Sequence, residues 1–430
     1  MSTPPMRIVP STLAMAPPPP SKRFAVLQLG ARMHYAVPAL LKRAGMLQHF
    51  YTDAVGNVGL TDVLRRLTPE WARPAPARRL LGRRLPPELS RDDVTTAQSL
   101  AIFDGLQSHG KTPAARRPLA PDWLRWHMQA NAFHGANALY CLDPGDVDMM
   151  KNARDRGMFI VYEQIIAPHV GRILREERAR HPGFEKQDSA REVEAGIRLD
   201  KQIWDLADIV LAPSDFVRDA MIELGADPHR VRLVPYGLSE NWFTRPPRQP
   251  QAGRVLFVGG VGLRKGNHIL AAATRLLQQR GVPVEVRVVG PYDPKMIAAP
   301  LFAGPTYVGQ VPRSEVREEF LQADVFAFPT LAEGFALAHL EAMACGVPVV
   351  TTPNCGPATR DGQDGFIVEP RDAVGLADRI EAIVRDRALR DRLAQSARKQ
   401  ATNFSWGHYQ HRLLAALDPS TTELTEKRAA

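Results

Sequence analysis

The chain has 430 residues, 44% of them hydrophobic and 23% charged, which is the composition of a globular protein longer than one core usually holds. No apolar run approaches about 18 residues, so a membrane-spanning helix is not expected. Three cysteines without metal-ligand spacing (Cys141, Cys345, Cys355) and no compact zinc pattern indicate a reducing, cytoplasmic setting. The net charge of +9 suits anionic partners, but no recognised nucleic-acid module appears, so nucleic acid is not expected.

The N-terminal half alternates short apolar runs with helical patterns. Residues 1–22 are rich in proline and predict a disordered tail rather than a signal peptide. Residues 23–32 then predict a strand and a glycine turn at Gly30, followed by a helix that ends near Gly45. Further strands are expected at 138–143, 158–164, 208–214 and 231–238. We take residues 23–240 as an N-terminal domain.

Residues 63–84 are a basic interruption of this pattern. They hold seven arginines against one acid, with leucines and a tryptophan interleaved. Such a segment can lie on an anionic membrane surface or bind an acidic acceptor. An arginine-rich solvated insertion explains the same composition equally well.

The second half repeats the alternation after a linker at 241–252. Strands are expected at 254–258, 284–289, 306–308, 324–328 and 347–351, within a second domain at 253–405. Residues 406–418 predict a helix that crosses back to the N-terminal domain, and 419–430 a frayed tail. Repeated βα units predict an α/β fold with two doubly wound, Rossmann-like domains. Their ligand should lie at the carboxyl ends of the strands, in the cleft between the domains.

The stretch "FVGGVGLRKG" (257–266) joins an expected strand to an expected helix. Lys265 stands where a dinucleotide-binding turn needs its third glycine, and Arg264 where a P-loop needs its second, so both fingerprints fail. What remains is a glycine turn that carries an Arg–Lys pair to a helix start, an arrangement suited to a diphosphate. These ten residues alone fit a solvated surface turn just as well.

A second motif lies between the strands at 324–328 and 347–351. Glu333 and Glu341 are spaced E-x7-E, the first in the loop and the second in a helix expected to begin near Phe335. Carboxylates accept hydrogen bonds from sugar hydroxyls, and the amides of residues 335–338 can hold phosphate at the helix start. Together with the Arg–Lys pair, this spacing matches a sugar nucleotide.

The second half resembles the family-4 retaining glycosyltransferases of the GT-B fold. The resemblance rests on "FVGGVGLRKGNHIL", "YVGQVPRSEVREEFLQADVFAFPTLAEGFALAHLEAMACGVPVVTT" and "RDGQDGFIVEPRDAVGLADRI". It implies two domains facing each other across a cleft, no permanent cofactor, and a nucleotide-sugar co-substrate such as a UDP- or GDP-sugar. It also implies metal-independent transfer with retention of configuration, because protein cations and helix dipoles neutralise the leaving diphosphate.

The resemblance assigns roles by position. Arg264 and Lys265 would bind the diphosphate, Glu333 the transferred sugar and Glu341 the ribose. The remaining donor-binding positions are glycines and backbone groups: Gly30, Gly259, Gly260, Gly309, Val311, Pro312, Gly334, Phe335, Ala336, Leu337 and Ala338. The catalytic group would be Glu333, Arg264 and Lys265.

The sequence also departs from the family pattern. Many relatives have arginine where this chain has Gly260, so Arg264 must supply that charge, and "NCGPATRDG" lacks the glutamate often found there. Relatives often place a histidine near "ALYCLDPG", where this chain has Tyr140 and Cys141. His134, Glu163 and His169 are candidates to contact acceptor or sugar, and we assign no catalytic base. The letters "DVD" at 146–148 match a metal-binding Asp-x-Asp pair but lie away from the donor motifs, so no metal is expected.

The expected function is transfer of a sugar from a nucleotide sugar to a glycan, lipid-linked or small-molecule acceptor. The expected setting is cell-surface polysaccharide or glycolipid synthesis at the inner membrane face, with 63–84 as a docking patch. An NAD-dependent oxidoreductase is not supported, because the third glycine of the dinucleotide-binding turn is missing and the E-x7-E spacing would have no role in such an enzyme. A catalytically degenerate GT-B protein that binds a sugar or a partner transferase stays open as the alternative.

Overall fold

The computed structural model describes residues 22–69, 73, 77, 80–107, 118–244, 249–356 and 358–418. The expected tails at 1–21 and 419–430, and part of the basic segment 63–84, lie outside these ranges. Among the described residues, no helix combines the length and the hydropathy that crossing a bilayer requires.

The N-terminal domain is built on a seven-stranded parallel sheet. Its strands are β1 (Phe24–Leu27), β2 (Leu47–Thr52), β3 (Val94–Thr96), β4 (Ala138–Cys141), β5 (Phe159–Glu163), β6 (Ile209–Ala212) and β7 (Val231–Leu233), in the order β3-β2-β1-β4-β5-β6-β7. Its α-helices are α1 (Ala36–Arg43), α2 (Gly59–Leu67), α4 (Gln98–Gln107), α5 (Leu119–Ala130), α6 (Val147–Asp155), α7 (Val170–Arg180), α8 (Ala190–Leu206) and α9 (Asp215–Glu223). The central strands are apolar on both faces because helices cover both; "FAVL" of β1 is wholly buried.

The C-terminal domain has a six-stranded parallel sheet of the same kind. Its strands are β8 (Arg254–Val258), β9 (Glu285–Val289), β10 (Thr306–Gly309), β11 (Val325–Phe328), β12 (Val349–Thr351) and β13 (Gly365–Ile367), in the order β10-β9-β8-β11-β12-β13. Its α-helices are α10 (Asn267–Gln279), α11 (Pro294–Ile297), α12 (Arg313–Gln322), α13 (Leu337–Ala344), α14 (Ala373–Arg385) and α15 (Arg387–Ala401). The two sheets confirm the prediction of two doubly wound α/β domains.

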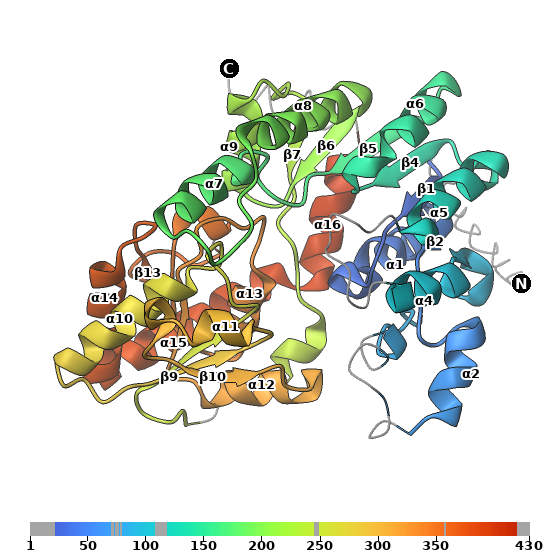
Figure 1. The fold of residues 1–430 in the computed structure, drawn as a ribbon. Coiled ribbons are helices and arrows are strands. Elements are labelled where there is room, and N and C mark those ends of the chain that lie inside the picture. Colours follow the sequence, from blue (N-terminus) through green and yellow to red (C-terminus); the bar gives the residue numbers. More distant parts are fainter. Residues whose placement is uncertain are drawn as a thin grey trace, which may run out of the picture.

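The last helix, α16 (Trp406–Leu417), returns to the N-terminal domain (Figure 1), where Arg412 donates to the carbonyl of Pro235, just after β7, at 3.1 Å. The backbone of Leu238 bonds to Phe404 and Trp406 on either side of Ser405. Near the far end of the helix, Lys22 donates to the carbonyl of Leu417 at 3.2 Å. The chain therefore crosses between the domains twice, once before β8 and once before α16.

Candidate functional site

The glycine turn after β8 lies against the carboxyl ends of the neighbouring strands. The amide of Gly259 donates to the carbonyl of Val289 at 2.9 Å. A Cβ added to Gly266, which has φ +70°, would lie 1.8 Å from the carbonyl oxygen of Pro329. Only glycine allows this approach, so the turn is held beside the loop after β11.

The Arg–Lys pair of this turn meets Glu333 from the loop after β11. Arg264 Nη1 and Lys265 Nζ both contact Oε1 of Glu333, the lysine at 2.5 Å. Arg264 Nη1 also donates to the carbonyl of Ala332 at 2.9 Å. The side chains remain partly accessible, with 31%, 20% and 14% of the surface of Arg264, Lys265 and Glu333 exposed. Burial lowers the pKa of Lys265, and the charge of Glu333 opposes that shift. Two motifs that are about 70 residues apart in sequence thus form one charged cluster.

Helix α13 begins two residues later than the sequence predicts. Its first residue is Leu337, and the amide of Ala336 donates to the carbonyl of Cys355 at 3.2 Å. The expectation that all four amides of 335–338 are free is therefore wrong for Ala336. The amides of Leu337 and Ala338 stand in the first turn, where N–H groups have no partner within the helix. Glu341 lies one turn further along and is half-buried.

Beneath the same helix, His339 is buried, with 1% of its surface exposed. Its Nε2 bonds to Oγ1 of Thr359, and its Nδ1 lies 3.7 Å from Sγ of Cys355. Burial lowers the pKa of His339 to about 3. The side chain therefore stays neutral in the folded protein and ties α13 to the loop after β12.

This burial predicts a loss of stability in mild acid. Below the unfolded pKa of about 6.5, the unfolded state binds a proton that folded His339 does not bind until about pH 3. The free energy of unfolding should therefore fall with pH below about 6.5, by about 1.4 kcal/mol per pH unit for this histidine. Urea unfolding between pH 7 and 5 should show a smaller pH slope for His339→Gln, while the exposed His411→Gln should keep the wild-type slope. Equal slopes in His339→Gln and wild type would contradict the assignment.

Gly309, Val311 and Pro312, which the resemblance places among the donor-binding positions, lie at or just after the end of β10. Gly309 has φ +86°, and its carbonyl accepts from the amide of Gly290 at 2.9 Å. Pro312 is the N-cap residue of α12, and Val311 packs on the core. The ring of Tyr292, which the sequence did not single out, would lie 3.7 Å from a Cβ at Gly309. This end of the sheet therefore offers an aromatic ring beside exposed backbone.

The loop that carries Glu333 is also in contact with the N-terminal domain. Ser214, after β6, donates through Oγ to the carbonyl of Gly334 at 2.6 Å. A Cβ added to Gly334 would lie 1.8 Å from the carbonyl oxygen of Ile165, after β5. The ring of Phe335 packs on Tyr236 at 5.7 Å between centroids. The two domains are therefore closed on each other at this loop.

Gly30 lies in the loop after β1, with φ +72° and no atom within 4 Å of an added Cβ. Its amide donates to Oδ1 of Asp53 at 2.8 Å, and Oδ2 of Asp53 accepts from Arg83 at 2.6 Å. One end of the basic segment thus supports the loop expected to approach the donor.

Glu163, at the end of β5, is buried in a polar cluster at the same edge of the sheet. It accepts hydrogen bonds from the hydroxyls of Tyr140 and Tyr236, the latter at 2.6 Å. Arg32 lies 3.6 Å away and donates to the hydroxyl of Tyr236 at 2.8 Å. Because Tyr236 also packs on Phe335, this cluster connects the N-terminal sheet to the loop of Glu333.

The other two acceptor candidates do not join this cluster. His134 precedes β4, at the amino ends of the strands, where it stacks on His49 at 3.9 Å and bonds to Tyr51. His169 is the residue before the first turn of α7, without a side-chain capping bond, and its ring packs against Phe216. The contacts of Glu163 therefore lead through Tyr236 to the loop of Glu333, whereas those of His134 lie at the opposite edge of the sheet.

The Asp-x-Asp letters do not form a pair. Asp146 is buried and accepts from Arg125 Nε at 2.8 Å, and burial raises its pKa to about 7. The side chain of Asp148 is 94% exposed and pairs with Lys151. The two carboxylates therefore do not face a common site: that of Asp146 is buried against Arg125, and that of Asp148 is exposed.

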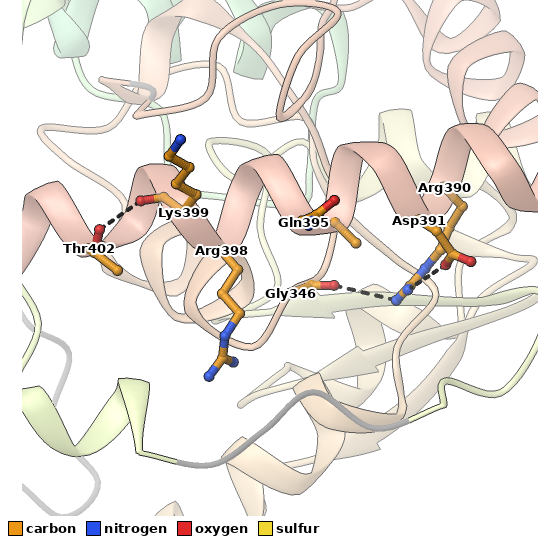
Figure 2. A pocket seen from close by; sticks show the side chains of 8 residues that line it. Gly346, Arg390, Asp391, Gln395, Arg398, Lys399 and Thr402 are labelled. Carbon is orange, nitrogen blue, oxygen red and sulfur yellow. Dashed lines mark hydrogen bonds and ion pairs between the residues drawn. The ribbon is translucent and has the colours of Figure 1, made fainter.

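A pocket of the C-terminal domain lies along α15 (Figure 2). Its cations are used by the fold: Arg398 donates to the carbonyl of Ala344 at 2.9 Å and Arg390 to that of Gly346 at 3.4 Å. These carbonyls lie at the C-terminal end of α13, where cations stabilise the free acceptors. The pocket contains none of the donor motifs. The arginines that line it stabilise the packing of α15 against the end of α13 rather than serving catalysis.

Comparison with known proteins fits this arrangement. Residues 239–400, which contain the glycine turn, the charged cluster and α13, match the model of the group 1 glycosyl transferases. Over these residues the C-terminal domain is similar to the group 1 glycosyl transferases. The chain is 32% identical over 247 residues to a D-inositol 3-phosphate glycosyltransferase of Geodermatophilus obscurus, covering 50% of this chain and 53% of that protein. It is 28% identical over 251 residues to a glycogen synthase of Mycobacterium tuberculosis, covering 56% and 60%. The chain thus spans little more than half the length of these glycosyltransferases.

Solved structures extend the likeness to both domains. The sucrose-phosphate synthase of Thermosynechococcus elongatus superposes with a TM-score of 0.62 at 18% identity, covering 95% of this chain and all of that one. HepE of Anabaena, solved with UDP and glucose, superposes with a TM-score of 0.59 at 16% identity, covering 92% and 99%. At this identity the likeness establishes the fold, which is the GT-B arrangement of glycosyltransferases.

Proposed function

We propose that the protein transfers a sugar from a nucleotide sugar to an acceptor, with retention of configuration, as the family-4 enzymes it resembles do. The observation that carries the proposal is the cluster of Arg264, Lys265 and Glu333 beside the first turn of α13. Two cations and free helix amides suit a diphosphate, and a carboxylate suits sugar hydroxyls.

The ion pairs suggest how the donor enters. Glu333 forms ion pairs with both Arg264 and Lys265. A diphosphate would take its place at Arg264 and Lys265, because phosphate oxygens carry more charge than one carboxylate. Glu333 would then be released to accept hydrogen bonds from the transferred sugar. Donor binding and alignment of Glu333 would thus be a single event.

No metal is required in this proposal. Arg264, Lys265 and the amides of Leu337 and Ala338 would stabilise the negative charge that develops on the leaving diphosphate. Glu341 would bind the ribose, and the backbone at Gly309 the base, with Tyr292 as a stacking surface for it.

The acceptor would enter from the N-terminal domain. A pocket at the carboxyl ends of β1 and β4 is lined by Leu29, Asp122, Arg125, Asp143 and Gly145, among others. Arg125 is already paired with Asp122, Asp143 and Asp146. An uncharged, hydroxyl-rich acceptor such as a glycan or polyol therefore suits this pocket better than an anion does.

We further propose that α2 docks on an anionic membrane, placing the enzyme at the inner membrane face for glycan or glycolipid synthesis. Three apolar side chains of this helix are exposed: Val63 by 51%, Leu64 by 38% and Leu67 by 75%. The side chain of Arg66 beside them is 69% exposed. Apolar side chains next to arginine are typical of helices that lie in an anionic interface.

Vesicle binding tests this docking surface. Leu67→Ser with Arg66→Ser should markedly reduce co-sedimentation with phosphatidylserine vesicles, because both the apolar and the charged contacts are removed. Arg275→Ser, on α10 of the other domain, is the control and should bind as wild type does. Undiminished binding by the double variant would refute the proposal.

The alternative of a non-catalytic sugar-binding GT-B protein rests on Tyr140 and Cys141, which stand where relatives often have histidine. Thermal unfolding with a panel of nucleotide sugars tests the donor site, which the catalytic and the non-catalytic function share. At about 100 times its dissociation constant, a donor should stabilise the protein by about 2.7 kcal/mol. A panel without any stabilising nucleotide sugar would refute the donor site itself.

A further inference from the structure

Helix α7 reaches from the N-terminal domain onto α10 of the C-terminal domain. Glu177, near the end of α7, is buried, and its Oε1 lies 2.7 Å from Nε2 of His268 in the first turn of α10. His181, one turn after Glu177, brings its Nε2 to 3.7 Å from the same oxygen. Three groups able to bind a metal ion thus meet between the two domains.

The backbone holds this group of side chains in place. The amide of His181 donates to the carbonyl of Glu177 at 3.0 Å, so both residues lie on one side of the helix end. His268 is 2% exposed and follows directly after Asn267, whose side chain accepts from the amide of Gly262. The ligand positions therefore come from two helix ends rather than from mobile loops.

The spacing suits a small tetrahedral cation. The three ligand atoms lie within 4.8 Å of one another. Zinc bonds of about 2.0–2.2 Å place tetrahedral ligands about 3.3 Å apart. This value lies between the 2.7 Å and 3.7 Å that separate Oε1 of Glu177 from Nε2 of His268 and Nε2 of His181. The third pair, between the two imidazoles, lies within 4.8 Å, so binding of an ion would draw the three side chains together. Two imidazoles with one carboxylate favour zinc over magnesium or calcium, which prefer oxygen ligands.

The surroundings complete a metal site. The other oxygen of Glu177 accepts from Arg371 Nε at 2.5 Å, as the free oxygen of a metal-bound carboxylate usually accepts from a second group. His181, with 28% of its side chain exposed, keeps this group of side chains accessible from solvent, from which a water could supply the fourth ligand. Nδ1 of His268 has no partner among the described residues, and it would carry the imidazole proton once Nε2 binds the metal.

We propose that Glu177, His181 and His268 bind Zn²⁺ and that the ion acts as a structural clasp between α7 and α10. His268 follows Lys265 by three residues, but the zinc site takes no part in the chemistry proposed for the donor. Binding of the ion would hold the domains in the closed arrangement seen at Gly334. It does not depend on the protein being a glycosyltransferase.

Equilibrium dialysis of the metal-stripped full chain against Zn²⁺, with metal analysis of the protein, tests the site. Wild type should retain one zinc per chain and no magnesium. His181→Gln should weaken zinc binding by about tenfold or more, because it removes one of three protein ligands. His411→Gln, an exposed histidine of α16, is the matched control. The unfolding temperature of metal-free His181→Gln should equal that of metal-free wild type, because the side chain is partly exposed.

A second readout covers the case in which His181→Gln fails to fold. Co²⁺ added to wild type should give the visible absorption of a tetrahedral site, and Zn²⁺ should abolish it. Absence of retained zinc in wild type, or equal zinc affinity in wild type and His181→Gln, would overturn the proposal. Loss of zinc from His411→Gln would place the metal elsewhere and overturn it too. In those cases Glu177 only bonds to His268 and Arg371.

Discussion

Replacing Lys265 by methionine is expected to lower kcat/KM for the nucleotide-sugar donor by about 10²–10³-fold, the usual cost of removing one preorganised group that stabilises developing negative charge. Methionine keeps much of the aliphatic stem but removes the ammonium, which lies 5.1 Å from the ring centre of Phe328 and 2.5 Å from Glu333. The protein should fold, because Arg264 still pairs with Glu333.

Initial rates of nucleotide release at varied donor concentration measure this effect. Lys295→Met, which removes an exposed lysine of α11, is the control and should leave the rates unchanged. A Lys265→Met enzyme within a factor of two of wild type would show that the lysine does not contact the donor.

Gly334→Ala is expected to have an effect of similar size through the contact between the domains. The new methyl group would lie 1.8 Å from the carbonyl oxygen of Ile165, so the domains must separate and the bond from Ser214 must break. Displacing reacting groups by about 1 Å costs about 10²-fold in rate, so kcat should fall at least that far.

The matched control is Gly196→Ala in α8, where an added Cβ meets nothing within 4 Å. It should keep wild-type activity and gain about 0.5–1 kcal/mol of stability, because alanine suits a helix interior better than glycine does. Small-angle scattering should show a larger radius of gyration for Gly334→Ala alone. Wild-type kcat in Gly334→Ala would mean that the contact with Ile165 is not part of the working enzyme.

Sequence patterns predicted the fold because parallel strands buried on both faces are continuous apolar runs, as in "FAVL" of β1 and "VFAF" of β11. They missed β2, whose "LQHFYT" mixes polar residues into a central strand, and the three-residue edge strands β3 and β13. His49 in β2 is buried by stacking on His134, a tertiary contact that no local pattern encodes.

The donor-binding residues could also be predicted from the sequence, since Arg264, Lys265 and Glu333 lie in short motifs with fixed spacing. The contact between the two domains could not be predicted from the sequence. Ser214, Ile165 and Glu177 come from loops and helix ends that reach the donor motifs only in three dimensions. The position of Ser214, two residues after the end of β6, was a local signal for it. The use of the Ala336 amide by Cys355 depends in the same way on the loop after β12.

The central claim is that the cluster of Arg264, Lys265 and Glu333 serves sugar transfer. Its most direct test is the time course of nucleoside diphosphate release from a panel of UDP- and GDP-sugars, with glycan and polyol acceptors, for wild type and Glu333→Gln. The account predicts release by wild type from at least one donor, with a rate about 10²-fold lower for Glu333→Gln. Binding of a nucleotide sugar without any release by wild type, or equal rates in both proteins, would contradict it.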